Sequence, residues 1–210
     1  MPRTKRAKLP HPFRFPLKPH CRVHGPQGHK SYTAYKQWLR DEFAFRCVYC
    51  LTRERWSADG QNRFSIDHIK PKSRHRKLIT DYDNLVYACQ RCNTLKSAKL
   101  GLPDPCQTNL SKHLKLLHSA LFVGLTPEGK RLVEYLRLNA PERVSDRRMQ
   151  LYFFQTPARH PKEILDSTFG YPEDLPDLVK LKPPKGNSRP EGVKASHYVR
   201  RQRKELPDYY

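Results

Sequence analysis

The chain has no long apolar run, and acidic residues are scarce for its length. No stretch of about 18 apolar residues occurs in its 210 residues, so we expect no membrane-spanning helix and no membrane partner. The chain has only 20 aspartates and glutamates but 41 lysines and arginines, which gives a net charge of +21. A field of this sign favours a polyanion, most commonly nucleic acid. A basic protein with lysines merely scattered over its surface is the alternative.

An export signal is also missing from the sequence. The first residues, Met1 to Lys8, are basic but lack the apolar segment of a signal peptide. Six cysteines without such a signal indicate a reducing compartment, so we expect a cytoplasmic protein. In that setting, paired Cys-x-x-Cys motifs indicate metal binding more often than disulfides.

Two Cys-x-x-Cys pairs, Cys47/Cys50 and Cys89/Cys92, are the strongest local signal. Turns of this kind present thiolates to one tetrahedral zinc ion, at about 2.3 Å each. The 38 residues between Cys50 and Cys89 exceed the roughly 15 to 20 of a simple zinc ribbon. We therefore predict a structural zinc site with a functional insert between its halves. A redox pair is the alternative.

The insert contains a predicted strand that leads to an Asp-His dipeptide. Residues 63–69 alternate as a strand does, Asp67 and His68 lie near its end, and Pro71 ends it. A basic loop follows, and its position beside the dipeptide favours phosphate contact over a merely solvated loop. Its charged members are Lys70, Lys72, Arg74, His75, Arg76 and Lys77. A short helix starting near Arg91 would carry Asn93 and Lys96 on one face.

Taken together, these motifs resemble the zinc-containing branch of the HNH endonucleases. The matching residues are Cys-x-Tyr-Cys, Asp-His-Ile-x-Pro-x-Ser and Asn-Leu-Val-x-Ala-Cys-x-x-Cys-Asn-x-x-Lys, within residues 47–99. A looser likeness extends through residues 124–130 and 136–139. The resemblance implies an α+β fold: a small ββα-metal (His-Me finger) core with zinc knuckles, flanked by helices and flexible basic termini.

The same resemblance implies roles for individual residues. His68 would be the general base for phosphodiester hydrolysis, Asp67 and Asn93 would bind a divalent cation such as Mg²⁺, and Asn84 would hold the loop that orients His68. The cysteines Cys47, Cys50, Cys89 and Cys92 would hold the zinc. Oxygen donors suit a hard cation, and a histidine with an ordinary pKa near 6.5 can accept a proton at neutral pH.

The resemblance also implies a substrate, which we expect to be DNA. Its phosphates would contact Lys70, Lys72, Arg74, Arg76, Lys77 and Lys96. The motif does not exclude RNA, and a non-catalytic zinc module that only binds nucleic acid or a protein is the alternative function. No base-reading element is evident, so a partner protein that gives specificity is also plausible.

The rest of the chain suggests three parts. Residues 1–30, with eight basic residues and six prolines but no acid, are predicted to form an extended arm, in which His20, Cys21, His24 and His29 make no second metal site. The resemblance implies that residues 31–155 form a nuclease domain with a helical extension. Residues 156–210 are predicted to be a flexible basic tail, and Cys106 a lone thiol.

Within the middle part, we predict a helix over 33–45, capped by Ser31, whose aromatic stripe faces the core. Further helices are predicted over 109–118, 126–138 and 141–154, with a strand over 120–123. The helices would bury the back of the small module, which has too few apolar residues to be stable alone. A helix-turn-helix DNA reader is the alternative use for them.

Overall fold

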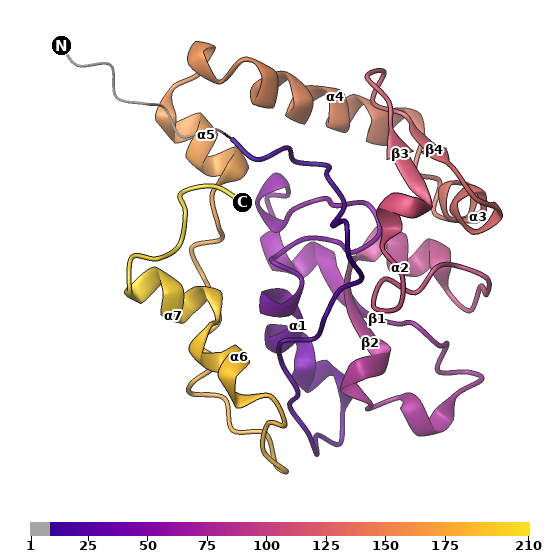
Figure 1. The fold of residues 1–210 in the computed structure, drawn as a ribbon, viewed down its shortest axis with the longest axis vertical. Helices are drawn as coiled ribbons and strands as arrows, with labels where there is room; N and C mark the ends of the chain where they lie inside the picture. Colours follow the sequence, from indigo (N-terminus) through magenta and orange to yellow (C-terminus); the bar gives the residue numbers. More distant parts are fainter. Residues whose placement is uncertain (1–8) are drawn as a thin grey trace.

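The computed structural model describes residues 9–210, and a ββα unit lies near the middle of the molecule (Figure 1). Strands β1 (Phe64–His68) and β2 (Leu85–Cys89) pair antiparallel, with Phe64 opposite Cys89 and His68 opposite Leu85. Helix α2 (Gln90–Lys96) follows β2 directly, so the second cysteine pair lies where the strand becomes the helix. The predicted fold class, an α+β fold around a ββα-metal core, is confirmed.

Helix α1 (Lys36–Glu42) packs against this unit through the predicted aromatic stripe. A 3-10 turn over Tyr32–Tyr35 precedes it, and the Ser31 hydroxyl accepts a hydrogen bond from the Thr33 amide, as expected of a cap. Trp38 and Leu39 are fully buried, so the stripe is core. The helix ends earlier than predicted, because Ala44 and Phe45 adopt left-handed backbone angles that a helix does not accommodate.

A second hairpin and two helices cover one end of the molecule. The hairpin pairs β3 (Leu114–Leu116) with β4 (Phe122–Gly124), and α3 (Pro127–Tyr135) and α4 (Pro141–Gln155) follow. Thr126 caps α3 and Pro127 occupies its first turn, as predicted. The predicted helix over 109–118 is wrong: a 3-10 turn, Leu110–Lys112, leads directly into β3. Pairing with β4 overrides the helical spacing of the leucines there.

The N-terminal arm and the C-terminal tail pack against the core instead of extending from it. Phe13 and Phe15 are buried in the main core, and Phe45 is buried with Tyr171 and Tyr210 of the tail. The expectation of an arm that buries no apolar surface is therefore wrong for residues 9–30, while Met1 to Lys8 lie outside the described residues. The tail, which was expected to be flexible, also buries side chains against the core. Sparse aromatic residues anchor both segments. The tail helices are α5 (Lys162–Phe169), α6 (Pro190–Lys194) and α7 (His197–Gln202).

Two buried acids at the end of α1, Asp41 and Glu42, fasten the arm and the tail. We name them the α1 carboxylates. Asp41 accepts hydrogen bonds from His24 Nε2 at 2.8 Å and from His197 Nδ1 at 3.0 Å. Glu42 accepts from His20 Nε2 at 2.7 Å and from the backbone amide of His24 at 3.0 Å. Burial alone would raise the pKa of Asp41, but the hydrogen bonds and charges of His197 and His24 outweigh it and hold the pKa at about 2.

The remaining short segments are 3-10 turns, which cover Glu54–Trp56, Gly60–Arg63, Arg76–Leu78, Tyr82–Asn84 and Pro157–Arg159.

Within residues 9–210, no helix is both long and apolar enough to cross a membrane.

Candidate metal centre and active site

The four paired cysteines converge on one point. Their sulfur atoms all lie within 4.8 Å of one another, and no other group of three or more potential His, Cys, Asp or Glu ligands occurs in the part of the chain that the structure describes. The Cys50 and Cys89 sulfurs are 3.8 Å apart. Four thiolates about 2.3 Å from a tetrahedral ion have edges of about 3.8 Å, so this cluster fits zinc.

Local backbone geometry builds the two halves of this centre. In the first knuckle, the Leu51 amide donates to the Cys47 carbonyl at 2.9 Å, and Leu51 itself has a left-handed φ of 60°. The Val48 amide donates to the Tyr87 carbonyl at 3.0 Å, which attaches this knuckle to β2. The second knuckle is the start of α2, where the Cys92 amide contacts the Cys89 sulfur at 3.5 Å. Each thiolate pair is thus positioned by its own tight turn.

An arginine from α4 reaches the same cluster. Arg143 is buried, and its Nη2 donates to the Cys92 sulfur at 3.3 Å. Four thiolates around one Zn²⁺ carry a net negative charge, which a guanidinium partly neutralises. Helix α4 therefore contacts the back of the zinc module, in the position predicted for the helical extension.

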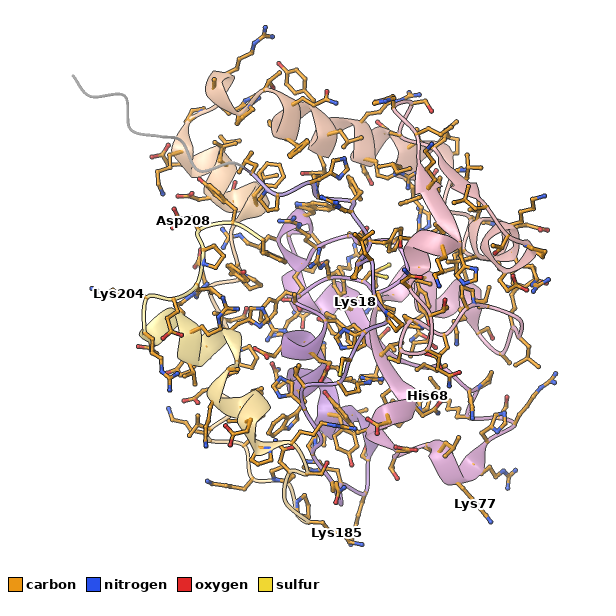
Figure 2. All side chains as sticks on the ribbon, viewed as in Figure 1. Lys18, His68, Lys77, Lys185, Lys204 and Asp208 are labelled. Carbon is orange, nitrogen blue, oxygen red and sulfur yellow. The ribbon has the colours of Figure 1, made fainter. Side chains whose placement is uncertain are left out.

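His68 lies at the end of β1, in the lower half of the molecule as drawn (Figure 2). Its Nε2 is 3.0 Å from the Ile79 carbonyl oxygen. A carbonyl only accepts, so Nε2 carries the hydrogen and the neutral ring keeps a lone pair on Nδ1. Burial lowers the pKa of His68, which favours this neutral form. The ring is therefore oriented with one nitrogen able to accept a proton.

Asn84 holds the loop that supplies this carbonyl. Its side-chain oxygen accepts from the Lys70 amide at 2.8 Å, and its Nδ2 donates to the carbonyls of Lys70 and Leu78, both at 3.1 Å. Leu78 directly precedes Ile79, so these bonds fix the backbone that orients His68. The role of Asn84 in orienting His68 stays a prediction.

Asp67 is enclosed by two donors. The Tyr49 hydroxyl donates to its Oδ2 at 2.6 Å, and Lys96 Nζ lies 3.1 Å from both carboxylate oxygens. Lys96 also donates to the His68 carbonyl at 2.7 Å. Asp67 is 4% exposed and Lys96 is 3% exposed. Burial raises the pKa of Asp67, against the lowering effect of the Lys96 charge. The carboxylate is thus already satisfied by protein groups.

Asn93, the other predicted cation ligand, lies on the neighbouring element. Its Nδ2 donates to Ser65 Oγ at 2.9 Å and to the Ile66 carbonyl at 3.2 Å, which leaves its amide oxygen outside these bonds. Asp67 and Asn93 are thus oxygen donors on β1 and α2. Oxygen donors of this kind suit a hard cation. In this arrangement, however, the oxygens of the Asp67 carboxylate are bonded to Lys96 and Tyr49, so the site does not fit a hydrated ion.

The basic loop after β1 is on the surface, as its predicted role requires. Its exposed cations are Lys70, Lys72, Arg74, Arg76 and Lys77. Lys96 differs from them: it was predicted to face nucleic acid, but its ammonium is buried against Asp67. Of the other predicted features, Cys106 is half-buried, and burial raises the pKa of its thiol to about 11.

Three residues at the site were not predicted from the sequence. Tyr49 bonds Asp67, Arg143 bonds Cys92, and the Tyr32 ring packs edge-on against His68, with centroids 4.9 Å apart. The position of Tyr49 inside the first cysteine motif could have indicated its role. Nothing in the sequence indicates Tyr32 or Arg143, since each reaches the site from a distant element.

A ββα unit, a cluster of four cysteines that could hold a metal ion, and a histidine at the end of the first strand define a ββα-metal domain. Residues 47–99 match the family model described as HNH endonuclease. This part of the chain is therefore an HNH domain.

Among curated proteins, the chain is similar to the Septu protein PtuB of Bacillus thuringiensis. The two are 31% identical over 109 residues, which cover 50% of this chain and 40% of that protein. The chain thus aligns with less than half the length of this relative. No solved structure matches.

Proposed function

We propose that the protein is an endonuclease that hydrolyses phosphodiester bonds in DNA, with His68 as its general base. The observation that carries this proposal is the contact of His68 Nε2 with the Ile79 carbonyl, because it leaves Nδ1 free to take a proton. In the proposed reaction, Nδ1 accepts a proton from a water molecule as that water attacks phosphorus in line with the leaving oxygen. Asn84 and Tyr32 maintain the ring orientation.

The family's divalent cation, when bound, supplies positive charge to the phosphate oxygens and the leaving oxygen. Magnesium suits the oxygen donors of Asp67 and Asn93, although the Asp67 carboxylate is held by Lys96 here. Zinc at the four cysteines would have a structural role. These assignments of cations to sites are part of the proposal.

The DNA substrate is supported by charge. The net charge of +21 and the exposed cations next to His68 favour a polyphosphate. Such binding weakens steeply as the salt concentration rises, because the release of counterions from the DNA becomes less favourable. Phosphate contacts do not read sequence, so we also propose that specificity comes from a partner protein.

The test is cleavage of supercoiled plasmid with Mg²⁺, with EDTA, and with the variant His68→Ala. We expect nicking that requires both the cation and His68. His118→Ala, which replaces an exposed histidine on the hairpin after β3, is the matched control and should cut normally. Plasmid binding without cutting under every metal would instead identify a non-catalytic zinc module.

A further inference from the structure

We propose that Arg22 of the arm and Arg189 of the tail are positioning residues of the nuclease site, because together they hold the Asp83–Leu85 turn beside His68. This inference rests on the proposed function and goes beyond it. It means that the two ends of the chain complete the site, although both lie outside the family match over residues 47–99.

The Asp83–Leu85 turn borders His68 on two sides. Its last residue lies directly opposite His68 in the pairing of β1 with β2. Asn84, its middle residue, donates to the Leu78 carbonyl at 3.1 Å. The next carbonyl, that of Ile79, is the one that His68 Nε2 contacts. A shift of this turn therefore moves both the strand end that carries the imidazole and the backbone that binds it.

Arg22 binds two backbone carbonyls of this turn through one nitrogen. Its Nη2 donates to the Asp83 carbonyl at 3.1 Å and also to the Leu85 carbonyl. Its guanidinium lies over the rings of Phe43 and Tyr82, with 5.2 and 5.3 Å to their centres. A planar guanidinium that stacks on aromatic rings presents its nitrogens in fixed directions, which a lysine ammonium cannot do. Arg22 therefore fixes both ends of the turn relative to the core.

Arg189 holds the same turn from the tail. Its Nη1 and Nη2 each donate to one carboxylate oxygen of Asp83 at 3.1 Å, which is the two-pronged pairing of a guanidinium with a carboxylate. Its Nη1 also donates to the His24 carbonyl at 2.7 Å, so this arginine links the turn to the arm as well. The ion pair is partly exposed and adds little to stability, so we expect its effect on geometry.

Backbone pairing between the arm and the tail brings the two arginines to one place. The Ser188 amide donates to the Gly25 carbonyl at 2.9 Å, and the Gln27 amide donates to the Gly186 carbonyl at 2.9 Å. These bonds flank an antiparallel bridge between the two segments. The arm and the tail therefore act on the turn as one unit, although they lie far apart in the sequence.

The experiment replaces each arginine by lysine in the full-length protein, which keeps the charge that DNA senses but removes the planar fork. Long-range proton–nitrogen NMR of protein labelled with nitrogen-15 at histidine, above the ordinary pKa of about 6.5, reports the tautomer of His68. His68→Ala assigns its signals. We expect the Nε2-protonated ring in wild type, and in Arg22→Lys and Arg189→Lys the two nitrogen shifts should move towards each other, as in a ring that exchanges between tautomers. Arg203→Lys, at an exposed tail position, is the matched control and should leave them unchanged.

Plasmid nicking gives a second readout. Each of the two lysine variants should lower kcat about tenfold with little change in KM, because a misplaced base slows the reaction while the phosphate contacts remain. Unchanged His68 nitrogen shifts in both folded variants would overturn the proposal, and so would the same change in Arg203→Lys. If Arg22→Lys does not fold, Arg189→Lys decides, since its ion pair is partly exposed. Failure of wild-type protein to nick plasmid would reject the nuclease, whereas the NMR comparison would still decide whether the two arginines position His68.

Discussion

At the scale of single residues, we expect the proposed site to depend on side chains that orient His68 without taking part in the proposed reaction. Tyr32 is half-buried, its ring contacts the imidazole edge-on, and Lys72 Nζ lies 5.3 Å from the centre of the same ring. Within residues 9–210, the Tyr32 hydroxyl forms no hydrogen bond. The contact with His68 is therefore made by the aromatic ring alone. We therefore propose that Tyr32 positions the imidazole of His68.

We predict that Tyr32→Ala lowers kcat about tenfold with little change in KM, because the imidazole gains freedom to rotate while the phosphate contacts remain. Tyr32→Phe keeps the ring and should retain nearly normal kcat. Initial rates of plasmid nicking over a range of substrate concentrations separate the two constants. A rise in KM alone in Tyr32→Ala would show that the ring binds substrate instead.

At this scale, the sequence predicts which residue types carry the chemistry more reliably than it predicts which side chains contact one another. The spacing of the cysteines predicts the four-sulfur cluster that the structure forms, and the Asp-His dipeptide near a strand end marks the histidine that we propose as the base, because both features are local. The pairing of Lys96 with Asp67 was not predictable, since helical periodicity places Lys96 on a face but does not say whether its ammonium turns to solvent or inward. Tyr49 was quoted as part of a motif, yet only the fold brings its hydroxyl to Asp67.

At the scale of secondary-structure elements, helix α4 contacts the four-cysteine cluster, the proposed zinc site, through Arg143. We predict that Arg143→Gln accelerates zinc loss to a competing chelator by about tenfold, because outer partners of metal ligands have effects of this size on metal affinity. Release of zinc is followed with a colorimetric chelator. Arg148→Gln, five residues along the same helix and exposed, is the control. Equal rates in all three proteins would show that Arg143 only packs.

The α1 carboxylates give the arm and tail a dependence on pH. The folded-state pKa of Asp41 is about 2 against an ordinary 3.8, so its ionised form stabilises the fold above pH 3.8 and that contribution disappears as pH falls towards 2. A difference of this size corresponds to roughly 2 kcal/mol. We predict that Asp41→Asn lowers the free energy of unfolding at pH 6 by about this amount.

Urea titrations at several pH values check this prediction. The difference between wild type and Asp41→Asn should shrink between pH 4 and pH 2, whereas the exposed control Asp146→Asn should show no such trend. A difference that stays constant over this interval would mean that the charge of Asp41 does not hold the arm and tail.

Elements with strong end signals were predicted correctly, and those decided by tertiary pairing were not. Thr126, Pro127 and Glu128 mark the start of α3 because a cap, a first-turn proline and an early acid act locally. The segment 109–118 has leucines at helical spacing, yet β4 supplies the partner that makes residues 114–116 a strand. The composition of the two terminal segments, rich in proline and lysine, likewise predicted an extended arm and a flexible tail. Composition does not show that single aromatic residues such as Phe13 and Tyr210 are buried in the core.

At the scale of the whole molecule, positive charge is distributed around the chain, but one part of it lies next to His68. Lys77 belongs to the loop on the His68 side, whereas Lys204 lies at the opposite edge (Figure 2). Both lysines are exposed and each follows an arginine, Arg76 and Arg203. These two Arg-Lys pairs differ mainly in their distance from the proposed site.

We predict that replacing Arg76 and Lys77 together by glutamine weakens binding to a DNA duplex and reduces the slope of log affinity against log salt by up to about 1.8, since each lost phosphate contact removes about 0.9. The matched change of Arg203 and Lys204 removes the same net charge and should leave the slope nearly unchanged. Fluorescence anisotropy at four or more salt concentrations provides both slopes. Equal reductions in the two variants would mean that DNA responds to total charge alone, and the basic loop beside His68 would then have no special part in holding the substrate.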